Sequence, residues 1–233
     1  TGGTPTATYT TLNAAFSAIN AGTHQGVIDI TIVANTTEPA VAVPLLRSNA
    51  PSNYSSITIK PSGNVTVNSA AAPTASRGFI EFNGADNVTI DGDDPGTTGT
   101  RNLTFQAAAV TTTGVVVIRF ASSATTDGAS FNTVKNCIII GSRSAATSTV
   151  TTYGVYSGTS GTSTVTTSGQ SDNNDNLTIE NNEIRRCAYA IYCAGTSTNY
   201  MDNLIIRNNT IGSATAADDV STRGIYVQNT PAI

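Results

Sequence analysis

The densest group of side chains that could bind a metal or transfer a proton lies in the segment DGDDPG, which contains Asp91, Asp93 and Asp94. Carboxylates together with loop carbonyls are the ligands that Ca²⁺ prefers, so these three residues form a candidate calcium site. The alternative is a polar turn, because aspartate forms turns readily through its side chain. We favour the turn, and we expect no cofactor.

The other groups that could act as an acid, base or nucleophile are isolated from one another in the sequence. His24 is the single histidine, and it follows a predicted helix at a place where a surface residue is expected rather than a catalyst. Cys137, Cys187 and Cys193 allow at most one internal disulfide. Cys187 and Cys193 could pair across a turn, but we favour three small buried side chains. No nucleophile elbow, phosphate loop or metal-ligand spacing is found in the sequence, so we predict no catalytic residue.

Three tyrosines recur at matching positions of short strands and could bind a ligand by stacking. Tyr156, Tyr192 and Tyr226 occur in YGVYS, YAIYC and RGIYV. Because successive side chains of a strand point to opposite faces, they should form an outward ladder with a spacing of about 4.8 Å. An exposed aromatic ladder offers area and hydroxyls to a sugar or a protein. The alternative, that segment 158–175 folds over this sheet and covers the ladder, stays open.

These strands belong to an internal repeat. Five short segments begin with a small residue, at spacings of 36, 40, 36 and 34: Gly78, Gly114, Gly154, Ala190 and Gly224. Aligned on them, the following residues form an apolar inward column of Phe79, Val115, Val155, Ile191 and Ile225. The next column faces outward and places Ile80 and Val116 ahead of the three tyrosines.

A second element repeats between these segments. It reads NVTIDGDD, NTVKNCII, NLTIENNEI and NLIIRNNTI, and it aligns Ile90, Val134, Ile179 and Ile206. The next residues should face outward in a column whose charges alternate in sign and so specify register: Asp91, Lys135, Glu180 and Arg207. A sharp bend is predicted one residue later, at Gly92, Asn136, Asn181 and Asn208. Asparagine tolerates the left-handed conformation and can hydrogen-bond to its counterpart one coil away, and Gly92 serves the same bend without a side chain.

A unit this short cannot bury its own apolar face, so the units must stack on one another. One coil consists of a strand, a variable loop, a second strand, an asparagine corner and a short third strand. The sequence therefore predicts an all-β fold: a right-handed single-stranded parallel β-helix with three strands per coil. A β-sandwich or a propeller would need antiparallel hairpins and would leave the asparagine column without a role.

A single β-helix domain is predicted over residues 1–233. Residues 1–26 form a cap with an α-helix at about 10–21, which begins at Thr10 or Thr11 and turns Phe16 and Ile19 toward the core. Residues 27–76 form the first coil, with strands at 27–33, 55–60 and 64–68. Residues 77–233 form repeated coils with Thr/Ser/Gly-rich insertions at 93–100, 121–130, 143–151 and 158–175. The last coil stays open, so we expect that the natural protein continues or that this edge docks onto another molecule.

Composition limits the possible partners. The net charge is −4, charged residues make up 11% of the chain, and no basic stripe could hold phosphates, so nucleic acid is excluded. No apolar run approaches the roughly 18–20 residues that span a bilayer, so membrane insertion is not expected. Abundant threonine, serine, asparagine and glycine are typical of extracellular β-proteins, which predicts an extracellular location.

The segment GGTPTATYTTLNAAFSAINAGTHQGVIDITIVANTTEPAVAVPL, with YSSITIKPSG, FNGADNVTIDG and NTVKNCIIIGS after it, resembles a known family. It is similar to the N-terminal part of large Bacteroidetes cell-surface proteins with a pectin-lyase-like β-helix, and the similarity covers essentially the whole chain. The resemblance implies export by type IX secretion and a place at the cell surface, where such proteins are presumed adhesins or surface-layer components.

Enzymes of the pectin-lyase-like superfamily are matched poorly by this chain. The hydrolase branch uses Asn-Thr-Asp, Asp-Asp, Gly-His-Gly and Arg-Ile-Lys, of which only Asp93-Asp94 is found here. The lyases need a basic residue beside a calcium cluster, and none with a clear role is present.

We therefore expect a non-catalytic, secreted cell-surface β-helix that acts as an adhesin or structural scaffold. The alternative is a carbohydrate-binding or polysaccharide-degrading protein. The expected partners are glycans or cell-surface proteins, and end-to-end self-assembly into a homo-oligomer through the open C-terminal coil is a variant of the first hypothesis.

Overall fold

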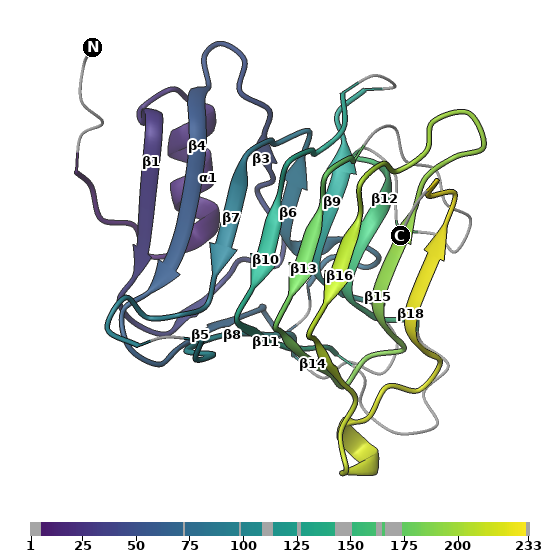
Figure 1. The fold of residues 1–233 in the computed structure, drawn as a ribbon. Helices are drawn as coiled ribbons and strands as arrows, with labels where there is room; N and C mark the ends of the chain where they lie inside the picture. The colour runs from purple at the N-terminus through teal and green to yellow at the C-terminus, as the bar shows by residue number, and fades with distance from the viewer. Residues whose placement is uncertain are drawn as a thin grey trace.

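The computed structural model describes residues 6–231 except 72, 98, 109–113, 125–126, 143–150, 162–164 and 166–173. Within these residues, three parallel sheets of six strands run along the molecule (Figure 1). Sheet A consists of β1 (Gln25–Ile32), β4 (Asn53–Pro61), β7 (Val88–Asp91), β10 (Thr133–Lys135), β13 (Thr178–Glu180) and β16 (Ile205–Arg207). Sheet B consists of β2 (Thr36–Thr37), β5 (Val65–Asn68), β8 (Leu103–Gln106), β11 (Cys137–Ile140), β14 (Glu183–Arg185) and β17 (Thr210–Ile211). Sheet C consists of β3 (Leu45–Leu46), β6 (Gly78–Asn83), β9 (Val116–Ser122), β12 (Tyr153–Ser160), β15 (Tyr189–Ala194) and β18 (Arg223–Gln228).

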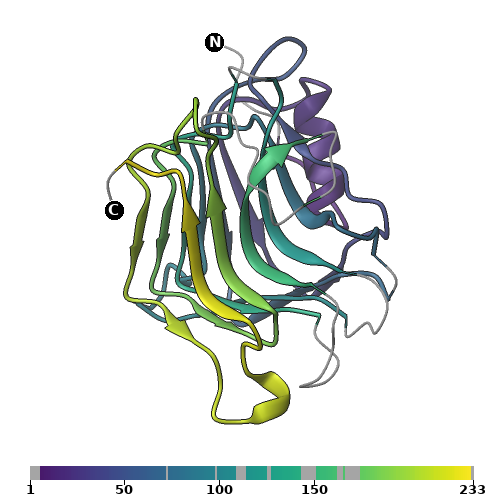
Figure 2. The same ribbon diagram turned by 90° about the vertical axis from the view of Figure 1, so that its right-hand side faces the viewer.

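The chain visits the three sheets in turn, so each group of three consecutive strands is one coil, from coil one (β1–β3) to coil six (β16–β18). Figure 2, viewed from the side of coil six, shows the coils one behind another. Hydrogen-bonded neighbours in a sheet are a full coil apart in sequence, which makes every pairing parallel. The predicted parallel β-helix with three strands per coil is confirmed.

The second repeated element has the register that the sequence predicts. Ile90, Val134, Ile179 and Ile206 are aligned in sheet A. The first three are at most 1% exposed, and they belong to one continuous core enclosed by the three sheets. Apolar side chains of successive coils pack on one another here, which is how units with little core of their own become stable.

The register of the first repeated element differs from the prediction in its earlier copies. Gly78 pairs with Val116 rather than Gly114, and Ile80 pairs with Ile118. Ile80 is therefore a buried core residue, and its predicted outward orientation is wrong. The physical reason is packing: in the observed register Phe82 stacks on Phe120 with ring centroids 5.0 Å apart. Alignment of two small residues, Gly78 and Gly114, contributes less to the choice of register than this aromatic contact does.

The predicted N-terminal cap is present as helix α1 (Leu12–Asn20). Thr11 is the N-cap, and its Oγ1 accepts a hydrogen bond from the Ala14 N–H at 3.0 Å. Phe16 and Ile19 are 0% and 1% exposed, and both belong to the continuous core, as predicted. The helix lies beside β3 at the end of the stack where β1 also lies (Figure 1).

The predicted first coil is divided differently in the structure. The strands expected at 27–33 and 55–60 lie in β1 and β4, which pair with each other and so belong to successive coils. Coil one is completed by the short strands β2 and β3, which the sequence pattern does not reveal. Among the predicted insertions, 143–150 and most of 158–175 lie outside the described residues. A second short helix, η1 (Ala216–Asp218), lies in the connection from β17 to β18.

Candidate functional site

The tyrosine ladder exists on the side of sheet C that faces away from the core. Tyr156 pairs with Tyr192, and Tyr192 pairs with Tyr226. Their rings stack, with centroids 5.0 Å apart in the first pair and 4.6 Å apart in the second. Tyr153 and Tyr189 stack beside them at 5.3 Å. Parallel pairing in register brings like side chains of successive coils to contact distance, so five tyrosines form one aromatic cluster.

Most of this ladder is covered. Tyr156 and Tyr192 are 0% and 1% exposed, whereas Tyr226 is half-buried. Val165 of segment 158–175 packs against the cluster. The expectation of an exposed ladder is therefore wrong for Tyr156 and Tyr192, and the described part of the segment supports the alternative of coverage. Burial also raises the pKa of Tyr153 and of Tyr192, so these hydroxyls stay protonated and are no candidates for a base.

Toward the N-terminus the ladder continues as a buried ion pair, not as Ile80 and Val116. Tyr156 pairs with Arg119, and Arg119 pairs with Glu81. Arg119 Nη1 lies 3.1 Å from Glu81 Oε1, and both side chains are 0% exposed. Burial lowers the pKa of Arg119, and the Glu81 carboxylate opposes that shift, so the guanidinium keeps its charge.

Further contacts hold this pair in place. Arg119 Nη2 donates to Thr159 Oγ1 at 3.0 Å and to the Ser160 carbonyl at 2.8 Å. Arg77 also contacts the Glu81 carboxylate. Thr159 and Ser160 come from β12, so the pair joins three successive coils. Both Nη atoms of Arg119 and the Glu81 carboxylate are engaged within the protein, which suits a structural role better than chemistry on a ligand.

The charged column of sheet A is confirmed as a series of ion pairs between coils. Asp91 lies 3.4 Å from Lys135 and 3.3 Å from Lys60, and Glu180 lies 2.5 Å from Arg207. Lys60 extends the predicted column by one coil. Burial alone would raise the pKa of Asp91, but hydrogen bonds and the two lysines outweigh it and lower that pKa below its ordinary value.

The structure does not bring the three candidate calcium ligands together. Asp91 faces the lysines, Asp93 accepts the Gly99 N–H at 2.9 Å, and Asp94 accepts the Gly63 N–H at 2.6 Å. Across the described part of the chain, no group of three or more His, Cys, Asp or Glu side chains is placed to hold a metal ion. The hydrogen bonds of Asp93 and Asp94 are those of the turn interpretation.

The asparagine corner forms the predicted ladder. Asn136, Asn181 and Asn208 have φ values of 57°, 53° and 56°. Asn181 Nδ2 donates to Asn136 Oδ1, and Asn136 Nδ2 donates to Asp91 Oδ1, both at 2.7 Å. Gly92 is needed for a different reason from the predicted one, because its φ is not left-handed. A Cβ at this position would lie 2.0 Å from the Asn136 carbonyl oxygen, so glycine permits close approach of two coils.

A second asparagine ladder, which the sequence reasoning missed, lies inside the coils. Asn182 Nδ2 donates to the Val134 carbonyl at 2.9 Å, and Asn182 Oδ1 accepts the Cys137 N–H at 3.0 Å. The Asn182 N–H in turn donates to Asn209 Oδ1 at 2.9 Å. The available signal was the second asparagine of ENNEI and RNNTI, which follows the corner residue in both segments.

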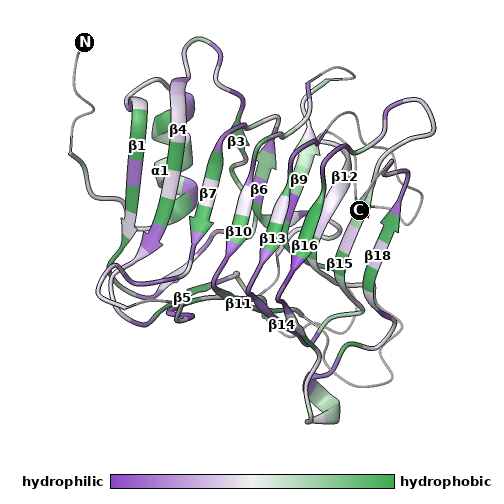
Figure 3. Cartoon of the chain, in the orientation of Figure 1, coloured by the Kyte–Doolittle hydropathy of each residue, from purple (hydrophilic) through white to green (hydrophobic). Residues whose placement is uncertain are grey.

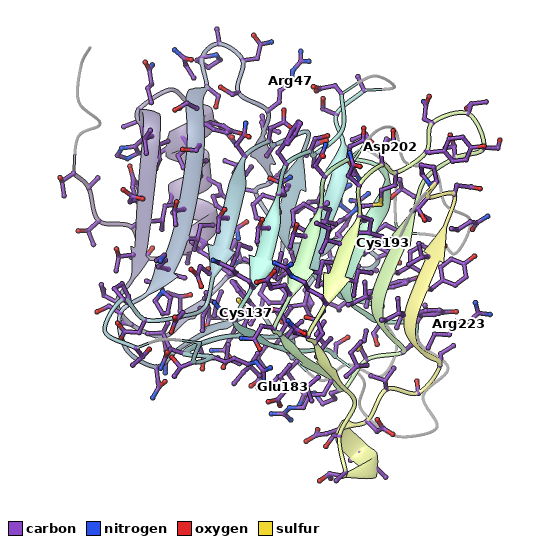
Figure 4. The ribbon with its side chains drawn as sticks, in the orientation of Figure 1. Arg47, Cys137, Glu183, Cys193, Asp202 and Arg223 are labelled. Atoms are coloured by element: carbon purple, nitrogen blue, oxygen red, sulfur yellow. The ribbon has the colours of Figure 1, made fainter. Side chains whose placement is uncertain are left out.

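The isolated reactive groups are all buried. His24 is 7% exposed, and its Nε2 lies 2.7 Å from the Tyr9 hydroxyl, so the predicted surface position is wrong. The loop after α1 thus contacts Tyr9, which precedes the helix, and no pattern in the sequence signals this contact. All three cysteines are buried thiols, which confirms that interpretation; burial raises the pKa of Cys193 to about 12. Cys137 and Cys193 lie inside the stack in Figure 4.

Comparison with family models, with curated proteins and with solved structures finds no match to this chain. In the parts of the chain that the structure describes, no helix is long and apolar enough to cross a membrane.

Proposed function

We propose that this protein is a non-catalytic, secreted cell-surface β-helix that acts as an adhesin or structural scaffold. The observation that carries the proposal is that ion pairs and stacked tyrosine rings connect neighbouring coils. Asp91, Glu81 and Arg119 form ion pairs between coils, and Tyr156 and Tyr192 stack on each other under cover. A stack tied in this way is a rigid body suited to presenting loops and ends.

The low charge, the abundance of threonine and serine, and the resemblance to Bacteroidetes surface proteins support the surface location. The insertions between strands support the adhesive part of the proposal, because loops on a rigid solenoid can vary without disturbing its core.

The experiment that tests this proposal measures adhesion and turnover on the same samples. Beads coated with the purified protein should attach to surfaces coated with glycans or glycoproteins more than beads coated with albumin. The same protein should release no unsaturated or reducing sugars from polygalacturonate or other polysaccharides. Steady release of sugar would contradict the non-catalytic part, and attachment no better than that of albumin would contradict the adhesive part.

A second candidate, carbohydrate binding, is favoured by the last member of the tyrosine ladder. Tyr226 is half-buried, and the Arg223 guanidinium carbon lies 5.0 Å from the centre of its ring. Arg223 is exposed on β18, the last strand of sheet C (Figure 4). A glycan array would test this candidate with Tyr226→Ala as the variant and the buried Tyr192→Ala as the control. Binding that Tyr226→Ala abolishes would support it, and no binding to any glycan would remove it.

A further inference from the structure

Two exposed aromatic side chains lie where the chain enters sheet A. The protein has eight tyrosines and six phenylalanines, all in the described part of the chain, and of these only Phe131 and Tyr200 are exposed, at 60% and 48%. Tyr200 belongs to coil six, which has a neighbouring coil on one side only. Phe131 immediately precedes β10 and has further coils on both sides, so its exposure does not arise from the end of the stack.

Phe131 also has an unusual backbone conformation. Its φ is 58°, in the left-handed region where a bulky side chain is strained. The residues in register with it are Asn87 in coil three, Asn176 in coil five and Asn203 in coil six, with φ values of 58°, 56° and 54°. Asparagine tolerates this conformation, and phenylalanine does not. Because the exposed ring gains little burial in return for the strain, Phe131 is a candidate for a contact outside the chain.

The ring of Phe131 interrupts a ladder of side-chain amides. Asn203 Nδ2 donates to Asn176 Oδ1 at 3.1 Å, as in the ladder at the other asparagine corner. Phenylalanine has no polar side-chain atom, so it offers no acceptor to Asn176 Nδ2 and no donor to Asn87 Oδ1. Among the described residues neither of these two atoms has a hydrogen-bond partner. A donor and an acceptor therefore flank the exposed ring, each about 4.8 Å away along the stack.

The charges near this corner are mostly negative. Asp86, Asp175 and Asp202 each precede an asparagine of the column, and Asp175 Oδ1 accepts the Asp202 N–H at 2.8 Å. Figure 3 shows hydrophilic residues where the chain enters the strands of sheet A, and Asp202 is labelled there in Figure 4. The guanidinium of Arg47 reaches the corner, but it is paired with Asp127 at 3.2 Å. A polyanion would be repelled from this surface, whereas an uncharged ligand would not.

We propose that the corner around Phe131 is a binding site for a neutral glycan, with one hexose ring stacked on the Phe131 side chain. The C–H face of a pyranose packs on an aromatic ring. Sugar hydroxyls both donate and accept, so they match Asn87 Oδ1 and Asn176 Nδ2. A protein partner is expected to bury further large apolar side chains, but the neighbours of the ring along this column are asparagines.

This inference rests on the proposed adhesive function, since it names the class of glycan that the protein would hold. The site is distinct from the candidate at Tyr226, which lies on the outer face of sheet C.

The variant that tests the site is Phe131→Asn, which removes the ring and introduces the residue that the neighbouring coils carry. We expect its thermal unfolding midpoint to equal that of the parent or to exceed it by up to about 4 °C, because the strain is relieved and the amide ladder becomes continuous. A lowered midpoint would show that the ring stabilises the fold, and would overturn the proposal.

Migration in native gels that contain a soluble polysaccharide measures binding. The neutral probes are barley β-glucan, xyloglucan and galactomannan, and polygalacturonate is the acidic comparison. We expect at least one neutral probe to retard the parent, and Phe131→Asn to weaken that binding by about tenfold or more, because the stacking surface is lost. Phe131→Trp keeps an aromatic face and should still bind. Val41→Asn is the matched control, since Val41 is 73% exposed at another place, and it should bind as the parent does.

Four results would overturn the proposal. They are no retardation by any neutral probe, retardation by polygalacturonate alone, equal retardation of the parent and Phe131→Asn, and equal weakening in Phe131→Asn and Val41→Asn. A protein partner is tested with coated beads on a surface of deglycosylated protein; attachment that Phe131→Asn abolishes there would assign the ring to a protein contact and would also overturn the proposal. The site and the adhesive function can fail separately, because bead attachment of the parent to glycoproteins can persist through other surfaces when the gels show no retardation.

Discussion

At its N-terminal end the coil stack is closed by α1, whereas at its C-terminal end the inner face of coil six is uncovered. Phe16 of the helix is 0% exposed and packs on Phe82, with ring centroids 5.8 Å apart. Ile225, an inward residue of the last coil, is 49% exposed. Both are large apolar side chains at an end of the same core. An inward side chain therefore stabilises a solenoid in proportion to how much of it the neighbouring coils or a cap cover.

The closed end is also tied down by polar contacts. Glu38, which is 1% exposed, accepts the backbone N–H groups of Leu12 and Asn13 at 3.0 and 2.9 Å. A carboxylate at this place satisfies two N–H groups of the first helical turn and complements the positive end of the helix dipole. Substitutions at the covered end and at the uncovered end should therefore differ in their effect on stability.

Removal of the Phe16 ring should have the largest effect. Phe16→Ala should lower the free energy of unfolding by about 3–5 kcal/mol, because a cavity would open between α1 and the core. Val27→Ala is the matched control at the same end, since Val27 is 66% exposed, and it should change stability by less than about 0.5 kcal/mol. Urea titration monitored by circular dichroism measures both. Equal losses in the two variants would show that α1 does not act as a cap.

Ile191 and Ile225 are neighbours in one inward column near the C-terminal end, but they differ in burial. Ile191→Ala should cost about 2–5 kcal/mol, because Ile191 is fully buried between coils four and six. Ile225→Ala should cost about 1 kcal/mol or less, because half of that side chain already faces water. The same urea titration measures both. A loss for Ile225→Ala as large as that for Ile191→Ala would mean that coil six is covered in solution.

The register of sheet A could be predicted from the sequence because three constraints coincide there. The apolar residue, the alternating charge and the corner asparagine recur at fixed spacing, so Val134 and Ile179 have no competing alignment. The first repeat of sheet C carries only a small residue and an apolar run. Such a run fits several registers, and the stacking of Phe82 on Phe120 and the ion pair of Glu81 with Arg119 that accompany the observed register are visible only once the strands are paired.

The candidate binding face shows a second limit of sequence reasoning. The spacing of Tyr156 and Tyr192 in the sequence predicted that they share a column. Whether their side chains are exposed to solvent depends on which segment packs against the outer face of sheet C. Val165 comes from a long segment without periodicity, so no pattern in the sequence states where it packs. The burial of His24 beside Tyr9 was missed for the same reason, since both residues lie in irregular segments.

Two corner asparagines provide a smaller version of the comparison. Asn181→Ala should cost about 2–3 kcal/mol, since alanine at positive φ costs about 1–2 kcal/mol and the hydrogen bond to Asn136 adds about 1 kcal/mol. Asn208→Ala, at the same corner of coil six, should cost about 1–2 kcal/mol from the backbone alone. Glycine adopts a positive φ without strain, so the glycine variants do not carry the backbone cost. Asn208→Gly should therefore be nearly neutral, whereas Asn181→Gly should still cost the hydrogen bond to Asn136. Thermal unfolding of the four variants tests this, and equal costs for the two glycine variants would contradict it.

The smallest effect concerns two aspartates whose pKa values move in opposite directions. The pKa of Asp91, between two lysines, is lowered, so its contribution to stability is present above its ordinary pKa of 3.8 and is lost as pH falls through the lowered value. The pKa of Asp175 is raised, first by burial and then by the neighbouring Asp202, so the folded state gains stability as pH falls through the raised value.

Asp91→Asn should therefore be less stable than the parent at neutral pH, with a difference that shrinks below pH 3.8. Asp175→Asn, which keeps an oxygen for the Asp202 N–H, should be more stable at neutral pH, with an advantage that disappears on acidification. Thermal unfolding midpoints between pH 7 and 3 measure both differences. If the two variants shift in the same direction at neutral pH, the pKa values of Asp91 and Asp175 do not move in opposite directions.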